Sequence, residues 1–118
     1  MADYERYLIT YETIEKLRVE RYELLQKRGP AKASLKTIEK AEKRTLAGLK
    51  LAAPSTCKSQ DAKADWAHSH DEYGVWLAGF EAALEAFEEI NDRIDQIDFT
   101  FEEWRTQRAD QRSERNFI

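Results

Sequence analysis

Large apolar side chains recur every seven residues along the second half of this sequence. Two such series, offset by three residues, are Tyr73, Phe80, Phe87, Ile94 and Phe101, and Trp76, Ala83, Ile90, Ile97 and Trp104. Because an α-helix has about 3.6 residues per turn, this spacing places both series on one face. The pattern predicts a long helix with one apolar face, here called the aromatic seam.

The stretch DFTFEEW, residues 98 to 104, leaves two alternatives for the end of this helix. The unbroken heptad phase indicates a continuous helix. In contrast, Thr100 and Glu103 have the spacing of a capping box, with Phe99 and Trp104 placed as a hydrophobic staple around it. On a continuous helix, Phe99 would point away from the aromatic seam. We therefore favour a break, with one helix ending near Ile97 and another starting at Thr100.

Two further helices are predicted upstream. The first starts near Asp3, whose carboxylate can cap the first turn, and ends at residue 28, because Gly29 and Pro30 form a typical stop signal. The second starts after the N-cap Ser34 and ends at residue 53, before Pro54. Charges along the first helix are interpreted as pairs within the helix, without a functional role.

The helix predicted at residues 34 to 53 has two distinct faces. One face carries small residues at spacings of four, three and four, namely Ala41, Thr45, Gly48 and Ala52. They predict a shallow groove that another helix approaches closely, which would explain glycine inside a helix. The opposite face carries lysines, among them Lys36, Lys40 and Lys43.

The segment between residues 54 and 68 is predicted to be a loop with at most a helical turn inside it. Ser69 and Glu72 then have capping-box spacing and predict the start of the third helix. The expected fold class is therefore all-α. We expect an antiparallel bundle of three main helices, at about 3–28, 34–53 and 69–97, with a shorter C-terminal helix at about 100–113, in one domain of 118 residues.

Charge is separated along the chain into blocks. Residues 26–63 hold ten Lys/Arg against three Asp/Glu, a net charge of +7, and residues 64–103 hold one against twelve, a net charge of -11. Such blocks are typical of internal pairing or of a partner with opposite charge. No run of apolar residues approaches the length of a membrane span, so we expect no membrane partner.

Candidate sites for chemistry have weak signals. His68, His70, Asp65 and Cys57 are metal-ligand types, but they lack the paired spacing of a structural zinc site. Capping and solvation are the preferred interpretation, and we predict no metal and no cofactor. Cys57 has no clear activating base and is interpreted as an inert thiol. No phosphate loop, catalytic motif or zinc motif is present, so we predict a protein that is not an enzyme.

Three charged stripes are candidate partner surfaces. Glu81, Glu85 and Glu88 recur at helical spacing away from the aromatic seam and indicate a solvated face that can dock a basic partner. The lysine face could bind phosphates, but nucleic acid is not the favoured partner because the pI of the chain is about 5.3. The third stripe consists of Arg105, Arg108, Arg112 and Arg115. Arginine binds carboxylates through two parallel hydrogen bonds, so this stripe is suited to contact an acidic surface.

These patterns lead to one main hypothesis for function. We expect a non-catalytic interaction or assembly protein that forms a homo-oligomer or docks in a larger complex, viral assemblies included. The partner-binding residues are expected to be the three charged stripes together with the seam residues Trp76, Phe80, Phe87, Ile94, Phe101 and Trp104. The alternatives are an acidic regulator or inhibitor of a basic, nucleic-acid-handling protein, and direct nucleic-acid binding through the lysine face.

A cytoplasmic location is expected, with a virion component as the alternative. The lone Cys57 fits a reducing compartment. The first residues contain charges and no apolar h-region, so we expect no secretory signal.

Overall fold

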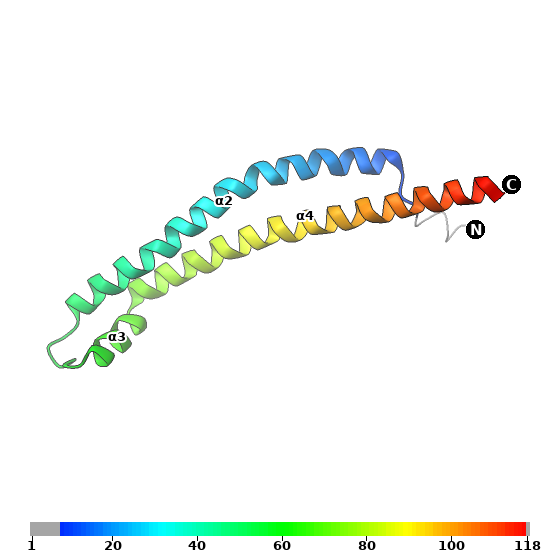
Figure 1. The fold of residues 1–118 in the computed structure, drawn as a ribbon. Coiled ribbons are helices and arrows are strands. Elements are labelled where there is room, and N and C mark those ends of the chain that lie inside the picture. The colour runs from blue at the N-terminus through cyan, green and yellow to red at the C-terminus, as the bar shows by residue number, and fades with distance from the viewer. Residues whose placement is uncertain (1–7, 118) are drawn as a thin grey trace. The chain divides into compact units, whose positions relative to one another are not determined.

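Helices are the regular secondary structure of the described part of the chain. The computed structural model describes the backbone of residues 8–117 and the side chains of residues 8–113. Within this range the elements are α2 (Tyr11–Ala52), α3 (Gln60–Ser69) and α4 (Asp71–Phe117), labelled as in Figure 1. No strand occurs among these residues. The predicted all-α class is confirmed.

The contacts of the chain group into two units. Unit 1 comprises Met1–Arg28 and Glu89–Ile118, and unit 2 comprises Gly29–Glu88. Both long helices therefore contribute one segment to each unit. The organisation as a single domain stays a prediction, and each unit is described below by itself.

Helix α2 begins at Tyr11 with a capped first turn. The backbone N–H of Thr13 donates to the Thr10 hydroxyl oxygen (3.2 Å), and the N–H of Ile14 donates to the Thr10 carbonyl (3.1 Å). Thr10 is thus the N-cap of this helix. Asp3, where the sequence suggested a helix start, lies outside the described residues.

The predicted helix end at Gly29 and Pro30 is wrong. Helix α2 is assigned without interruption from Tyr11 to Ala52, with Pro30 inside it. A proline in a helix interior costs roughly 3 kcal/mol, so the local signal is real. It is overridden because apolar residues on both sides of it are half-buried, Leu25 before it and Leu35 after it. Tertiary packing routinely outweighs such local preferences.

The segment predicted as a loop contains a three-turn helix. Helix α3 is capped by Ser59, whose hydroxyl oxygen accepts from the N–H of Ala62 (3.0 Å). The predicted N-cap role of Ser69 is also wrong. Ser69 is the last residue of α3, and its hydroxyl bonds to carbonyls of the same helix. His70 caps the start of α4 instead, because its Nδ1 accepts a hydrogen bond from the N–H of Glu72 (3.1 Å).

The predicted break between residues 97 and 100 is wrong as well. Helix α4 continues through this stretch, and the Thr100 hydroxyl donates to the Gln96 carbonyl one turn earlier (3.0 Å), instead of capping a new helix. A fourth helix is therefore not present among the described residues. Phe99 points away from the aromatic seam and is 62% exposed.

Each unit has its own small core. In unit 1, Ile14, Ile94 and Ile97 are at most 3% exposed. In unit 2, Leu49 is 4% and Ala67 is 0% exposed, and the indole N–H of Trp76 donates to the carbonyl of Ile38. All ten positions of the aromatic seam are buried or half-buried. The heptad spacing therefore correctly identified the inward face of α4.

The predicted close approach at Gly48 is wrong. Gly48 is exposed, and a Cβ placed there would meet no atom within 4 Å. The glycine therefore relieves no close contact at that position.

Candidate functional site

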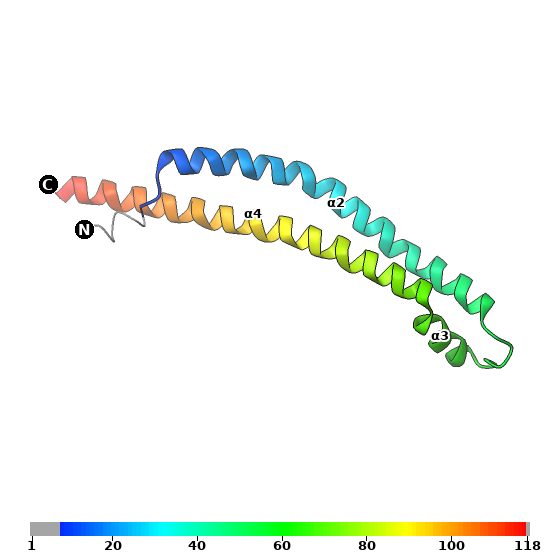
Figure 2. The same ribbon diagram turned by 180° about the vertical axis from the view of Figure 1, so that it is seen from behind.

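Two helix segments pack antiparallel in unit 1. Ile9, just before α2, contacts Gln107, whereas Glu20 and Arg21, further along α2, contact the earlier residues Arg93 and Asp98 of α4. In Figure 1 and Figure 2 the blue start of α2 lies beside the orange part of α4. The Gln107 amide holds the chain just before α2, because it accepts from the Ile9 N–H (2.9 Å) and donates to the Ile9 carbonyl (2.8 Å).

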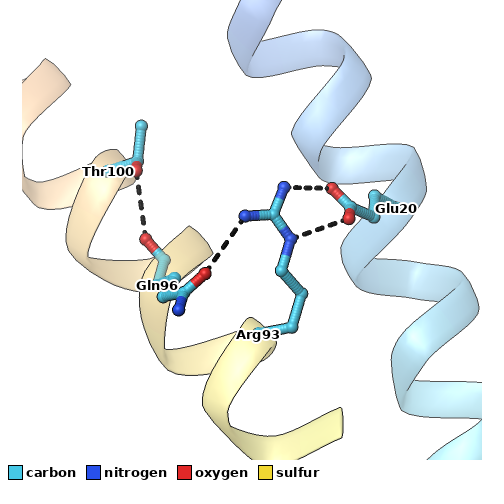
Figure 3. A network of polar contacts seen from close by, with 4 residues as sticks. All are labelled: Glu20, Arg93, Gln96 and Thr100. Carbon is cyan, nitrogen blue, oxygen red and sulfur yellow. Dashed lines mark hydrogen bonds and ion pairs between the residues drawn. The ribbon is translucent and has the colours of Figure 1, made fainter. Parts of the chain in front are cut away.

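Two ion pairs fix the register of these segments. Arg21 Nε donates to Asp98 (2.7 Å), and the Arg93 guanidinium donates to both carboxylate oxygens of Glu20 (2.8 and 2.7 Å). Arg93 also contacts the Gln96 side chain (3.3 Å), as Figure 3 shows. On α4, Arg93 and Asp98 are five positions apart, which is about 140° around the helix. The pairs therefore flank the buried isoleucines on opposite edges.

The ion pairs shift the titration of their members. The hydrogen bond from Arg93, partly opposed by burial and helped by the Coulomb attraction, lowers the pKa of Glu20. The same bond raises the pKa of Arg93, and the bond to Asp98 raises the pKa of Arg21. A charged Glu20 is therefore favoured by folding.

Acid is expected to remove the contribution of Glu20 to stability. Because folding lowers the pKa of Glu20, its contribution is present above the unfolded value near 4.3 and is lost as the pH falls through the folded pKa. The side chains of the pair are 40% and 42% exposed, so we expect Glu20→Gln to lower the free energy of unfolding at pH 7 by at most about 1 kcal/mol. Urea unfolding from pH 7 downward measures the difference from wild type.

The matched control is Glu85→Gln, an exposed carboxylate on the same helix as Arg93 that forms no ion pair with a described residue. This change should not lower the free energy of unfolding at any pH, because it removes like-charge repulsion with Glu81 and Glu89 and breaks no ion pair among the described residues. A Glu20→Gln deficit that stays constant below pH 3 would contradict the assigned role of the ion pair.

An open groove lies along one side of the two segments in unit 1. Its larger part is a cavity of about 380 Å³. An adjoining cavity of about 190 Å³ shares three of the lining residues. We call the combined feature the arginine groove, and its lining consists of Ile14, Arg18, Arg21, Tyr22, Leu25, Asp98, Phe101, Trp104 and Arg105.

The arginine groove combines aromatic rings with positive charge. Three arginines and one aspartate line it. Arg21 is engaged by Asp98, and Arg18 is engaged by Glu15 on the same helix. Arg105 is exposed and forms no ion pair with the residues that the structure describes. The Arg108 guanidinium lies 5.1 Å from the ring centre of Trp104 and adds a further cation next to the groove. Such a lining suits an apolar group flanked by carboxylates.

Several residues predicted to bind a partner meet at this groove. Phe101, Trp104 and Arg105 line it, with Arg108 beside them. Arg112 is exposed further along α4 and lines neither cavity. The side chain of Arg115 lies outside the described residues.

Other seam residues occupy different places. Ile94 belongs to the core of unit 1. In unit 2, Trp76 stacks on Phe80 with their planes 12° apart and their centres 5.3 Å apart. Trp76 also stacks on Tyr73 (5.4 Å), and Phe87 is half-buried. Tyr73, Trp76 and Phe80 therefore form a packed row within unit 2, and none of these rings lines the groove.

The acidic and lysine stripes are both on surfaces of unit 2. Glu81, Glu85 and Glu88 are exposed on α4, and Lys36, Lys40 and Lys43 are exposed on α2. A shallow depression among the lysines is also lined by Glu39, whose carboxylate reduces the local positive charge.

His68 and His70 lie where α3 ends and α4 begins. Nδ1 of His68 contacts the Ala64 carbonyl (2.7 Å), and its ring lies 5.0 Å from that of Tyr73. The ring of His70 caps α4 and lies 5.0 Å from that of Trp66. Within the described residues, no group of three or more His, Cys, Asp or Glu side chains is arranged to hold a metal ion.

Sequence reasoning missed the contribution of α2 to the arginine groove. Arg18, Arg21 and Tyr22 line it, although charges in this segment were interpreted as having no functional role. The Lys16–Glu12 pair (3.5 Å) does lie within the helix as expected. Arg21 was the available signal, because no acidic residue lies three or four positions from it on either side. No sequence pattern indicated that Gln107 would contact Ile9.

No protein-family model, curated protein or solved structure matches this chain. Among the described residues, no helix combines the length and apolar character needed to cross a membrane. Proposals about function therefore depend on the geometry of the chain itself.

Proposed function

We propose that the chain is a non-catalytic interaction or assembly protein whose arginine groove binds an acidic, amphipathic helix of a protein partner. The observation that carries this proposal is the meeting of Arg18, Arg105 and two aromatic residues, Phe101 and Tyr22, in one open groove. A third helix lying in the groove would complete an antiparallel helical bundle with the two segments of unit 1.

The charge of the groove supports an acidic partner. The Arg21–Asp98 and Arg18–Glu15 pairs are internally balanced, whereas Arg105 forms no ion pair with a described residue. Guanidinium groups bind carboxylates through two parallel hydrogen bonds, and a partly desolvated site strengthens them. Because Arg18 and Arg21 already pair with Glu15 and Asp98, Arg105 is the lining arginine to which an acidic helix would supply a carboxylate.

The aromatic lining supports an apolar anchor on that partner. Tyr22 is 63% exposed at one edge of the groove, and Phe101 and Trp104 are half-buried beneath it. Rings favour offset or edge-to-face contacts with an incoming ring. Aromatic and arginine side chains are also the types that dominate binding energy at protein interfaces.

Binding of a designed peptide tests this function. The probe is a capped helical peptide with Phe at the centre of one face and Glu at i-4, i+3 and i+4, and its control carries Lys at the three Glu positions. We expect the Glu peptide to shift the NMR signals of Arg18, Phe101 and Arg105, and the Lys peptide to leave them unchanged. Arg105→Glu should weaken binding about tenfold, equivalent to about 1.4 kcal/mol.

The matched control variant is Arg44→Glu, which makes the same change at an exposed helical position outside unit 1. It should leave the affinity of the Glu peptide unchanged. Equal binding of both peptides, or signal shifts confined to residues outside the groove, would overturn the proposal.

The alternative proposals depend on unit 2. An acidic regulator of a basic protein would use the exposed face of Glu81, Glu85 and Glu88. Direct nucleic-acid binding would use Lys36 and Lys40, although Glu39 lies between them. The groove proposal is preferred because its lining joins arginines with aromatic rings, whereas the cavity among the lysines is lined by Lys36, Glu39, Lys40 and Lys43 and the acidic stripe consists of carboxylates.

A further inference from the structure

Phe99 is the most exposed ring on the outer side of α4 in unit 1. It is 62% exposed on a continuous helix. It precedes Phe101 by two positions, so the two side chains point about 160° apart around the helix. Phe99 therefore belongs to neither the aromatic seam nor the arginine groove.

Four carboxylates surround Phe99. Asp95 lies at i-4, Glu102 at i+3 and Glu103 at i+4, with Asp92 one turn further back, and all four are exposed. On a helix, positions three and four apart are surface neighbours. None of the four forms an ion pair with a described residue. We call these four residues together with Phe99 the Phe99 face.

The Phe99 face complements the arginine groove. One is a protruding ring flanked by carboxylates that form no ion pair with a described residue. The other is an open aromatic groove lined by Arg105, which likewise forms none. Resting on the function proposed above, we propose that the groove of one copy of this chain binds the Phe99 face of a second copy. The partner helix is then a segment of the same sequence.

The contact must form between molecules. Phe99 and Phe101 point to nearly opposite sides of one helix, so Phe99 cannot enter the groove that Phe101 lines in the same copy. Because the two surfaces lie on nearly opposite sides of α4, one neighbour cannot engage both at once. The contact is therefore heterologous: each copy uses its groove for one neighbour and its Phe99 face for another. A single contact leaves one groove and one Phe99 face free, so further copies can add.

Complementation between two variants tests this inference. Phe99→Asp removes the Phe99 face and keeps the groove, whereas Arg105→Glu damages the groove and keeps the Phe99 face. At 50 mM NaCl we expect the wild-type molar mass from light scattering to rise with concentration, and each variant alone to stay a monomer. An equimolar mixture should form a heterodimer and stop there, because only one functional groove and one functional Phe99 face meet.

Two controls make the outcome specific. Val75→Asp changes another exposed apolar residue on α4, 75% exposed and in unit 2, and should self-associate like wild type. Circular dichroism should show unchanged helix content in both test variants, because Phe99 and Arg105 are exposed. Added salt should weaken wild-type association, since the contact depends on charge.

The possible failures are distinguishable from a failure of the proposed function. A monomeric wild-type chain, undiminished association of Phe99→Asp, or a mixture that stays monomeric would each overturn the identity of the partner. If the Glu peptide still binds the groove in that case, the proposed function stands with a different acidic partner.

Discussion

Ile97→Asp is expected to abolish the folded state of unit 1. Ile97 is 1% exposed and shares the unit 1 core with Ile14 and Ile94. A carboxylate there would lie in an apolar environment, and Arg93 one turn earlier is already engaged by Glu20. Burying such a charge is far more costly than losing the apolar contacts alone. Ile97→Ala, which only leaves a cavity, should already lower the free energy of unfolding by about 2 to 5 kcal/mol.

Phe99→Asp is the matched control for this prediction, two residues away on the same helix. Phe99 is 62% exposed, and the new carboxylate would lie three or four positions from Asp95, Glu102 and Glu103, so the replacement should lower the free energy of unfolding by about 1 kcal/mol or less. Phenylalanine, isoleucine and aspartate have similar helix propensities, so the comparison isolates burial. Urea unfolding followed by far-UV circular dichroism measures both. A cooperative transition of Ile97→Asp at the wild-type midpoint would contradict the assignment of the core.

Trp76→Ala is expected to cause the largest loss in unit 2, about 3 kcal/mol in the free energy of unfolding. The indole stacks between Tyr73 and Phe80 and donates to the Ile38 carbonyl at 2.7 Å. The substitution removes the ring stacking and the hydrogen bond together. Trp76→Phe keeps a ring and loses only the hydrogen bond, so about 1 kcal/mol should be lost.

The neighbouring Val75→Ala is the control for Trp76. Val75 is 75% exposed, so its truncation should be nearly neutral. Urea midpoints of the three variants, compared at equal slopes, rank the effects. If Trp76→Phe were as damaging as Trp76→Ala, the indole hydrogen bond and not the stacking would dominate, and the packed aromatic row would lose its assigned importance.

Local stop and start signals gave the wrong helix boundaries for a common reason. The capping box at Thr100 and the Gly29–Pro30 pair are each contained in a few residues, and a cap contributes only about 1 kcal/mol. In the folded chain Thr100 bonds to Gln96 within the continuous helix. Apolar residues that face inward on both sides of such a signal outweigh it, and their packing is invisible to a short sequence window.

The candidate site was predictable on one helix only. The heptad series identified Phe101 and Trp104, and the arginine stripe identified Arg105, because those patterns repeat along one segment. Arg18 and Arg21 were missed because they join the groove from a segment about 80 positions earlier, and no local spacing connects the two.

The sequence by itself determined that the described chain is helical and that the aromatic seam of α4 faces inward. The spacing of apolar residues is a property of neighbouring residues on one helix, so it can be recognised without knowledge of the tertiary fold. The tertiary structure decided the register that pairs Glu20 with Arg93 and Arg21 with Asp98. It also decided which arginines share a groove and that Phe99 stays outside, because those outcomes depend on side chains brought together from distant parts of the chain.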